Sequence, residues 1–192
     1  MAESQITTEV IARAQRGDAS ATSLIYQTYV TIIYRYVAYR VGSDEDAEDI
    51  TAEVFVRMVE SLSSYTDTGA PFEAWLYRIA AARVADFYRK RKRRTHVELT
   101  DNLVSDDTEP EERLLEHQEA IQLREAVRHL GEEEQTILLM RFVERKSHYE
   151  VAELLDKSVS AVKSAQHRAL VKLAGLLGSD EKARHYLRGQ ND

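Results

Sequence analysis

The sequence predicts an all-α protein of two small helical domains joined by an acidic flexible linker, and three observations support this class. The chain of 192 residues has only two prolines and seven glycines, so few positions interrupt a helix. Apolar residues recur at spacings of three and four over long stretches. No segment shows the alternation of apolar and polar residues, bounded by turn residues, that is typical of a strand.

Three long helices are expected in the first domain. Apolar residues repeat at helical spacing over 21–37, and again over 47–62 after a capping serine at Ser43. A third apolar stripe over 72–87 follows Pro71, a residue favoured at the start of a helix. Three such helices, joined by short turns, are enough to close a small core.

A change of composition divides the chain after the third helix. The helical period lapses, and residues 95–119 contain nine acids against a single base, Arg113. Such a segment is more typical of a linker than of a packed element. We therefore place a first domain at residues 1–94, a linker at 95–113, a second domain at 114–175 and a C-terminal tail of unassigned role at 176–192.

The second domain is expected to be a four-helix unit that ends in a helix-turn-helix. Ser147 and Glu150 stand three residues apart, as in a capping box, before a short helix of about eight residues. A break at 156–158 precedes a last long helix, for which Ser158 is the predicted cap. The residues expected to face inward from this helix are Val162, Ala165, Ala169 and Leu173.

The first turns of this last helix present a polar and basic face suited to the major groove of DNA. Hydroxyls and amides can bond phosphates or base edges, and Lys163 and Arg168 can also contact guanine acceptors. The candidate residues are Ser158, Ser160, Ala161, Lys163, Ser164, His167, Arg168 and Lys172. The alternative is an ordinary amphipathic helix whose solvent face is basic.

Charge is sorted along the chain, although the formal net charge is −7. Residues 43–60 contain seven acids and one base, whereas residues 83–94 contain seven bases and one acid. The six consecutive bases at 89–94 exceed what the dipole at a helix C-terminus favours, so this end is a candidate nucleic-acid surface. At 1.5 Å per residue, the helix from Phe72 to Arg94 is ~34 Å long, about one turn of duplex DNA.

Several other chemistries lack a signal. The absence of cysteine rules out disulfides and cysteine-ligated metals and fits a cytoplasmic location. The six histidines show neither metal spacing nor a nucleophile motif, and the acids at 44–49 lack the glycine and glutamate of a calcium loop. We therefore expect no enzyme activity, no metal and no cofactor. Neither a signal peptide nor a membrane-spanning apolar run is visible, so no membrane insertion is expected.

Four segments together resemble a known family. DAEDITAEVFVR at 46–57 and FEAWLYRIA at 72–80 resemble conserved region two of bacterial RNA polymerase sigma factors of the extracytoplasmic-function (ECF) group. EQTILLMRF at 134–142 and VKSAQHRAL at 162–170 resemble region four of the same group. The resemblance implies a transcription initiation factor that binds core RNA polymerase and directs it to promoters, reading the minus-35 element with the helix-turn-helix and melting the minus-10 element.

The resemblance also implies roles for residues of the first domain. The acidic helix would bind the clamp helices of the polymerase's largest subunit through Asp46, Glu48, Asp49, Ala52, Glu53 and Phe55. The segment around the start of the third helix would recognise and melt the downstream element, holding a flipped base near Tyr65 to Gly69. Its residues would be Tyr65, Thr66, Asp67, Thr68, Gly69, Trp75, Arg78, Ala82, Arg83, Arg89, Lys90 and Arg91. Phe72 and Trp75 also lie on the apolar stripe, where core packing is the preferred interpretation.

Four positions depart from the family's pattern. Ala52 stands where glutamine is frequent, Ala82 where asparagine often contributes to recognition, and Ala165 where arginine is common. Asp156 replaces the usual turn glycine, although aspartate tolerates a left-handed backbone better than most residues. These departures leave the promoter sequence undefined.

The expected partners follow from the same resemblance. They are promoter DNA and core RNA polymerase, through the clamp helices and the flap of the second subunit, with an anti-sigma factor as a further candidate. The acidic linker would thread the polymerase's basic channel, so the free protein is expected to bind promoters weakly. The alternative function is a dimeric helix-turn-helix regulator that binds an operator and senses a ligand through its first domain. An enzyme is the third class and has no supporting motif.

Overall fold

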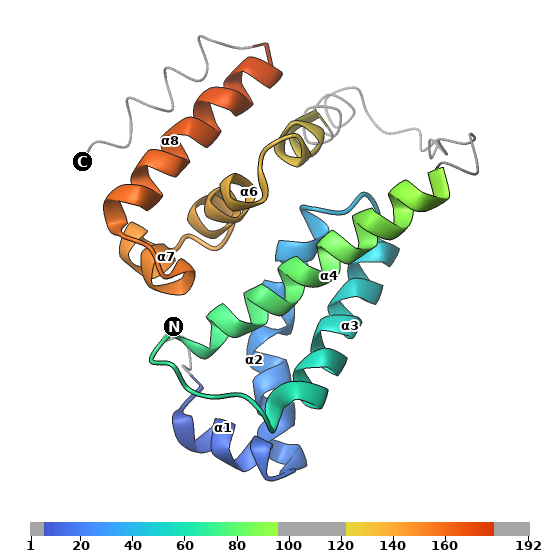
Figure 1. The fold of residues 1–192 in the computed structure, drawn as a ribbon, viewed down its shortest axis with the longest axis vertical. Helices are drawn as coiled ribbons and strands as arrows, with labels where there is room; N and C mark the ends of the chain where they lie inside the picture. The colour runs from blue at the N-terminus through green and yellow to red at the C-terminus, as the bar shows by residue number, and fades with distance from the viewer. Residues whose placement is uncertain (1–5, 96–121, 179–192) are drawn as a thin grey trace, which may run out of the picture. The chain divides into compact units, whose positions relative to one another are not determined.

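The computed structural model describes residues 6–95 and 122–178, and all regular structure within these ranges is helical (Figure 1). The chain divides into two compact units. The prediction of an all-α protein with two helical domains is confirmed. Thr95, the first residue of the predicted linker at 95–113, is the last residue of the helix that ends the first described range. The rest of that linker, the expected start of the second domain and all but the first residues of the tail at 176–192 lie outside the described residues.

The first unit holds four helices. They are α1 (Thr8–Gln15), α2 (Ala19–Ala38), α3 (Asp44–Leu62) and α4 (Phe72–Thr95). The last three correspond to the three long helices predicted from the apolar period. The period did not predict α1 as a separate element, because this short helix buries only Ile11 and Ala14.

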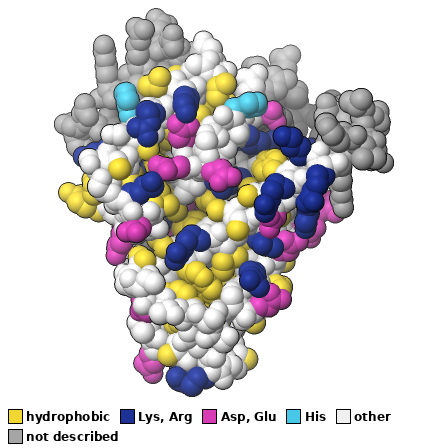
Figure 2. Space-filling model, viewed as in Figure 1, with side chains coloured by type: hydrophobic (Ala, Val, Ile, Leu, Met, Phe, Trp, Pro, Cys, Tyr) yellow, Lys and Arg dark blue, Asp and Glu magenta, His cyan; other side chains and the backbone are white. Residues whose placement is uncertain are grey.

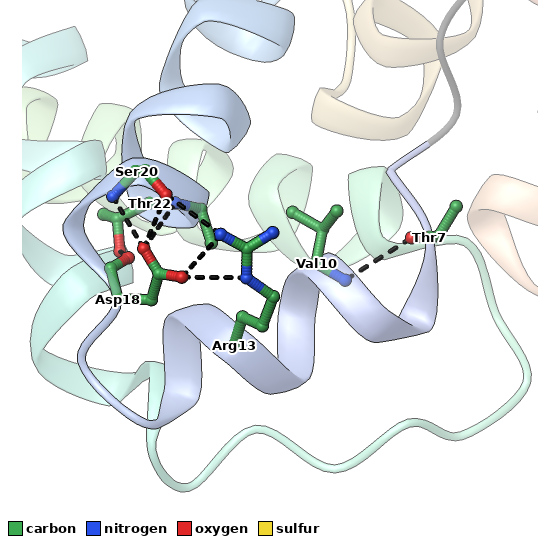
Figure 3. Close-up of polar contacts among 7 residues, drawn as sticks. Thr7, Val10, Arg13, Asp18, Ser20 and Thr22 are labelled. Atoms are coloured by element: carbon green, nitrogen blue, oxygen red, sulfur yellow. Dashed lines mark hydrogen bonds and ion pairs between the residues drawn. The ribbon is translucent and has the colours of Figure 1, made fainter.

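Capping side chains fix the beginning of the first unit (Figure 3). The Thr7 hydroxyl accepts a hydrogen bond from the Val10 N–H at 3.4 Å, and Asp18 caps α2 by accepting from the Ser20 N–H at 2.9 Å. Arg13 of α1 donates from Nε to Asp18 Oδ2 at 2.8 Å and from Nη2 to Ser20 Oγ at 3.0 Å. The bonds from Ser20 and Arg13 hold the pKa of Asp18 well below its usual range. These polar contacts therefore fix the turn between α1 and α2.

The core of the first unit is made by the predicted apolar stripes of the three long helices. Ser43 caps α3 by accepting a hydrogen bond from the Asp46 N–H at 3.1 Å, as predicted. Fully buried side chains come from α2, α3 and α4, and include Ile25, Ile33, Val37, Val54, Met58 and Leu76. Truncating a side chain of this kind to alanine typically costs about 2–5 kcal/mol of folding free energy.

The second unit contains a helical segment at 122–128, then α6 (Glu132–Leu138), η1 (Leu139–Val143), α7 (His148–Leu155) and α8 (Val159–Leu176). Its η1 is one turn of π-helix, which the apolar period did not predict. Buried side chains that join α6 to α8 and to the end of the first segment include Leu130, Leu138 and Ala169, with Leu170 and Leu173 packed against them.

Within the described ranges, no helix combines the length and the apolar character that crossing a membrane requires.

Candidate nucleic-acid interface

The helix-turn-helix predicted for the second unit is present as α7, a short turn and α8. In the turn, Asp156 has a positive φ of 52°, the left-handed conformation expected of it. The Ser147 N–H donates to Glu150 Oε2 at 2.6 Å, and the Glu150 N–H donates to Ser147 Oγ at 3.2 Å. Ser158 caps α8 by accepting a hydrogen bond from the Ala161 N–H at 3.2 Å. The turn and both caps therefore match the prediction.

The outer face of α8 presents the residues predicted to meet the upstream element. All eight are exposed: Ser158, Ser160, Ala161, Lys163, Ser164, His167, Arg168 and Lys172. The inward positions Val162, Ala165 and Ala169 are buried, as predicted, and Leu173 is half-buried. This division sets a polar, basic surface on top of an apolar one.

The cations of this helix-turn-helix differ in how they are paired. Lys172 Nζ lies 2.6 Å from Glu134 Oε1, and Lys157 Nζ lies 3.1 Å from Glu133 Oε2, so α6 neutralises both. The hydrogen bond from Lys172 also lowers the pKa of Glu134. Neither Lys163 nor Arg168 forms a salt bridge with another described residue. The positive charge available to a ligand is therefore concentrated at Lys163 and Arg168, in the first ten residues of α8.

A polar network beneath α8 was not predicted. Gln166 is buried, and its Oε1 accepts a hydrogen bond from Arg141 Nε at 3.1 Å and lies 3.0 Å from His148 Nε2. The Arg141 guanidinium also donates to the backbone carbonyl of Lys146. Burial lowers the pKa of His148, and the nearby Arg141 adds to this effect. The network joins η1, α7 and α8. The sequence feature that could have predicted it is Gln166, a polar residue within the apolar stripe of α8.

The loop between α3 and α4, residues 63–71, contains the residues predicted to hold a flipped base. The Tyr65 ring packs edge-on against Phe72 at 5.1 Å between ring centroids and lies 4.8 Å from the Trp75 ring. Burial, with the charge of Asp67, raises the pKa of Tyr65. Asp67 Oδ1 accepts a hydrogen bond from the Gly69 N–H at 2.8 Å, and Gly69 has a φ of +83° that favours glycine.

The structure brings the loop residues and the aromatic start of α4 into one cluster. Thr66, Asp67, Thr68 and Gly69 are exposed, whereas Tyr65 and Trp75 are half-buried. Phe72 is buried, so its expected core packing is confirmed. The cluster offers ring surface beside exposed polar groups, an arrangement suited to stacking an unpaired base.

One face of α4 continues from this cluster towards the basic end. Trp75, Arg78, Ala82 and Arg89 follow at spacings of three, four and seven, which place them on one side of a helix. Lys and Arg side chains gather along the later part of α4 in Figure 2. Lys90 and Arg91 are exposed there.

Asp86 interrupts this positive surface. The Arg83 Nη2 atom lies 2.9 Å from Asp86 Oδ2, and Arg89 forms an ion pair with the other oxygen of the same carboxylate. Two of the arginines predicted to meet DNA therefore share one acid.

The acidic helix α3 carries the residues predicted to bind the polymerase clamp. Glu48, Asp49, Ala52 and Glu53 are exposed, and Asp46 is half-buried. None of the three exposed acids forms a salt bridge with another described residue, whereas Glu60 near the end of the same helix pairs with Arg57.

Two valines that the sequence analysis overlooked extend this surface, while one predicted residue lies beneath it. Val56 and Val59 are 58% and 54% exposed, and with Ala52 they form a stripe at spacings of four and three. Phe55 is buried, and its ring packs edge-on against Tyr26 at 4.9 Å. The signal was a second apolar period on α3, beside the one that forms the core.

Among the described residues, no group of three or more His, Asp and Glu side chains is placed to hold a metal ion.

Comparisons with known protein families match both units. Residues 25–94 match the family Sigma-70 region 2, and residues 120–173 match Sigma-70, region 4. The first match begins within α2 and ends in the last turn of α4, and the second includes α7 and most of α8.

Individual relatives show the same likeness over both units. The chain is 36% identical to the ECF RNA polymerase sigma factor BldN of Streptomyces coelicolor, covering 91% of this chain and 67% of that protein. It is 35% identical to the ECF RNA polymerase sigma factor SigD of Mycobacterium tuberculosis, covering 85% and 80%. Among solved structures, CnrH in complex with the cytosolic domain of CnrY has a TM-score of 0.64 at 21% identity, covering 90% of this chain and 97% of that one. This last likeness is one of fold.

Proposed function

Because this chain belongs to the extracytoplasmic-function group of RNA polymerase sigma factors, we propose that separate surfaces of it read the promoter and bind the polymerase. The protein is a transcription initiation factor, not an enzyme, and it directs core RNA polymerase to promoter DNA. The single observation that carries the proposal is a preformed helix-turn-helix whose two unpaired cations stand on the exposed face of α8.

The domain boundaries are proposed as residues 1–94 for region 2, 95–113 for the linker and 114–175 for region 4, with 176–192 as a tail of unassigned role. The family matches at 25–94 and 120–173 support the two larger assignments. The match to region 2 begins after α1, so the role of α1 within the first domain is part of the proposal.

The upstream, minus-35 element is assigned to α8. Its exposed first turns can enter a major groove, with Lys163 and Arg168 contacting guanine acceptors or phosphates. The hydroxyls of Ser158, Ser160 and Ser164 are placed to bond phosphate or base edges. Lys172 is assigned a weaker part, because its ammonium already pairs with Glu134.

The downstream, minus-10 element is assigned to the loop 63–71 and the face of α4 that begins at Trp75. The aromatic cluster supplies stacking for a base taken out of the duplex, and the later bases of α4 bind the phosphates beside it. Flipping a base costs a few kcal/mol, which these contacts have to offset.

The exposed acids and valines of α3 are assigned to the clamp helices of the polymerase's largest subunit. An apolar stripe of Ala52, Val56 and Val59 between acids fits a partner helix that is apolar on one face and basic at its rim. Region 4 is assigned to the flap of the second subunit. Since core polymerase and promoters are in the bacterial cytoplasm, we place the protein there.

An anti-sigma factor stays a predicted partner. The neighbour CnrH was solved with the cytosolic domain of CnrY, and a sigma factor of Bartonella quintana, similar in fold with a TM-score of 0.58 at 17% identity, was solved with the anti-sigma factor NepR. The assignment is tested by capturing proteins that bind this chain and measuring whether a captured protein competes with core polymerase for α3.

Run-off transcription with purified core polymerase, followed by sequencing of transcript starts, tests the assignment of surfaces. The wild-type chain is expected to define one set of start sites with shared sequences near minus 35 and minus 10. Variants in α8, the 63–71 loop and α3 should fail at upstream binding, promoter opening and core binding respectively. Equal failure of all three variants at one common step would contradict the division.

A further inference from the structure

Gln15, the last residue of α1, joins this helix to the loop that precedes α4. Its Nε2 donates one hydrogen bond to the backbone carbonyl of Leu62 at 3.1 Å and another to the backbone carbonyl of Tyr65 at 2.8 Å. Leu62 is the last residue of α3, and Tyr65 lies in the 63–71 loop. One side chain therefore fixes the loop to the end of the helix from which it leaves.

The chemistry of these two bonds restricts what can stand at this position. Both acceptors are carbonyl oxygens, so both amide protons of Gln15 are used and the oxygen of the amide must point away. A carboxylate of the same shape has no proton to donate and would place negative charge against both oxygens. A methionine of similar length would fill the space without a donor.

The loop is anchored at one residue and exposed beyond it. The carbonyl of Tyr65 is held by Gln15, while its ring is held by Phe72 and Trp75. The next four residues, 66–69, are all exposed. The backbone bond from Gln15 therefore sets where the exposed segment begins and how the Tyr65 ring is presented.

We propose that Gln15 is a positioning residue for recognition of the unpaired minus-10 strand, an inference that rests on the proposed role of the 63–71 loop. Capture of an unstacked base is favoured when the receiving loop is already ordered, because less conformational freedom is then lost on binding. Gln15 supplies that order without contacting DNA. The function of α1 is then to brace the loop.

α1 has supports that do not depend on Gln15. Ile11 and Ala14 are buried, and Arg13 bonds Asp18 and Ser20. Substitution of Gln15 is therefore expected to release the loop while the helix stays in place.

The experiment uses holoenzyme assembled from core polymerase and the full chain, as wild type, Gln15→Met and Gln15→Glu. The matched control is Gln27→Glu, the same chemical change at an exposed position of α2. Each holoenzyme selects from a pool of single-stranded DNA with a randomised segment, and the enrichment of the preferred sequence over the pool is measured. Selection from a randomised duplex pool, scored for the upstream element, and affinity for core polymerase are measured in parallel.

We expect both Gln15 variants to lower single-strand enrichment about tenfold, with Gln15→Glu the more affected, while Gln27→Glu matches wild type. Duplex selection and core affinity should stay within about twofold of wild type in all three variants. Wild-type enrichment by both Gln15 variants overturns the inference, as does a loss of equal size in all three measurements, which would indicate a general structural role. A wild-type chain that enriches no single-stranded sequence overturns the proposed role of the loop itself.

Discussion

The two surfaces assigned to promoter DNA are held in different ways. α8 is a capped helix that lies on a polar network, with the buried Gln166 between Arg141 and His148, so its reading face exists before DNA arrives. The 63–71 loop is tied down at Tyr65 and exposed over the next four residues. The difference suits the two tasks, because a duplex groove can be read by a rigid face, whereas an extruded base has to be enclosed.

The largest effect is expected when the DNA-reading face of α8 is disrupted. The double variant K163E/R168E should lower transcription from a promoter that needs its upstream element by at least about 100-fold, since each lost contact costs about 1–3 kcal/mol and each new acid repels phosphate. Run-off yield in a reconstituted assay measures this.

The control for this double variant is Arg16→Glu, a charge reversal at an exposed position directly after α1, outside the surfaces assigned to DNA and to the polymerase. It should transcribe like wild type. Undiminished output from K163E/R168E would remove α8 from upstream recognition.

A second variant tests the 63–71 loop. Tyr65→Ala removes the ring that packs against Phe72 and Trp75, and should lower open-complex formation about tenfold or more, since one base–aromatic stack is worth about 1–3 kcal/mol. Permanganate footprinting of unpaired thymines measures the opening.

A pre-melted template separates the two surfaces. It should restore activity to K163E/R168E more than to Tyr65→Ala, because the latter lacks part of the single-strand site. Equal rescue of both would mean that the loop acts only in melting and does not hold the base.

A third change tests the assignment of the exposed valines of α3 to core polymerase. Val56→Arg places a cation in the exposed apolar stripe of α3 and should weaken core binding about tenfold without lowering the melting temperature, because the valine is already exposed. Fluorescence anisotropy with labelled core polymerase gives the affinity. A core affinity equal to that of wild type would place the clamp contact elsewhere on the protein.

The smallest effect concerns the paired cations of the second unit. The folded pKa of Glu134 lies below its ordinary value of 4.5, so its pairing with Lys172 contributes stability above that pH, and the contribution is lost as the pH falls through the folded pKa. Glu134→Gln should lower the free energy of unfolding by at most about 1 kcal/mol at pH 7, and the difference from wild type should shrink below about pH 4.5. Thermal unfolding across this range measures it, and a constant difference would contradict the pairing.

Sequence reasoning recovered those features that follow from local chemistry. The caps at Ser43 and Ser158, the box of Ser147 with Glu150 and the left-handed Asp156 each depend on a few neighbouring residues. The three long helices followed from strong apolar periods. These elements positioned both candidate DNA surfaces without knowledge of tertiary contacts.

What sequence reasoning missed depends on partners distant in the chain. Gln15 meets a loop 50 residues away, and Lys172 meets an acid 38 residues away, so no local pattern predicts either bond. The buried ring of Phe55 packs against Tyr26, 29 residues earlier on another helix. The exposed stripe of Val56 and Val59 was readable as a second period but was masked by the stronger core period beside it.

The pairing of Lys157 and Lys172 with acids of α6 has a consequence for how helix-turn-helix binding responds to ionic strength. A cation already neutralised within the protein releases few counterions when it approaches a phosphate. The segment from Lys157 to Lys172 contains four cations, but only two of them are unpaired. The affinity of the helix-turn-helix for DNA should therefore decrease with added salt as expected for about two phosphate contacts, not four. With so gentle a dependence, α8 would keep more of its affinity for the upstream element as the salt concentration rises.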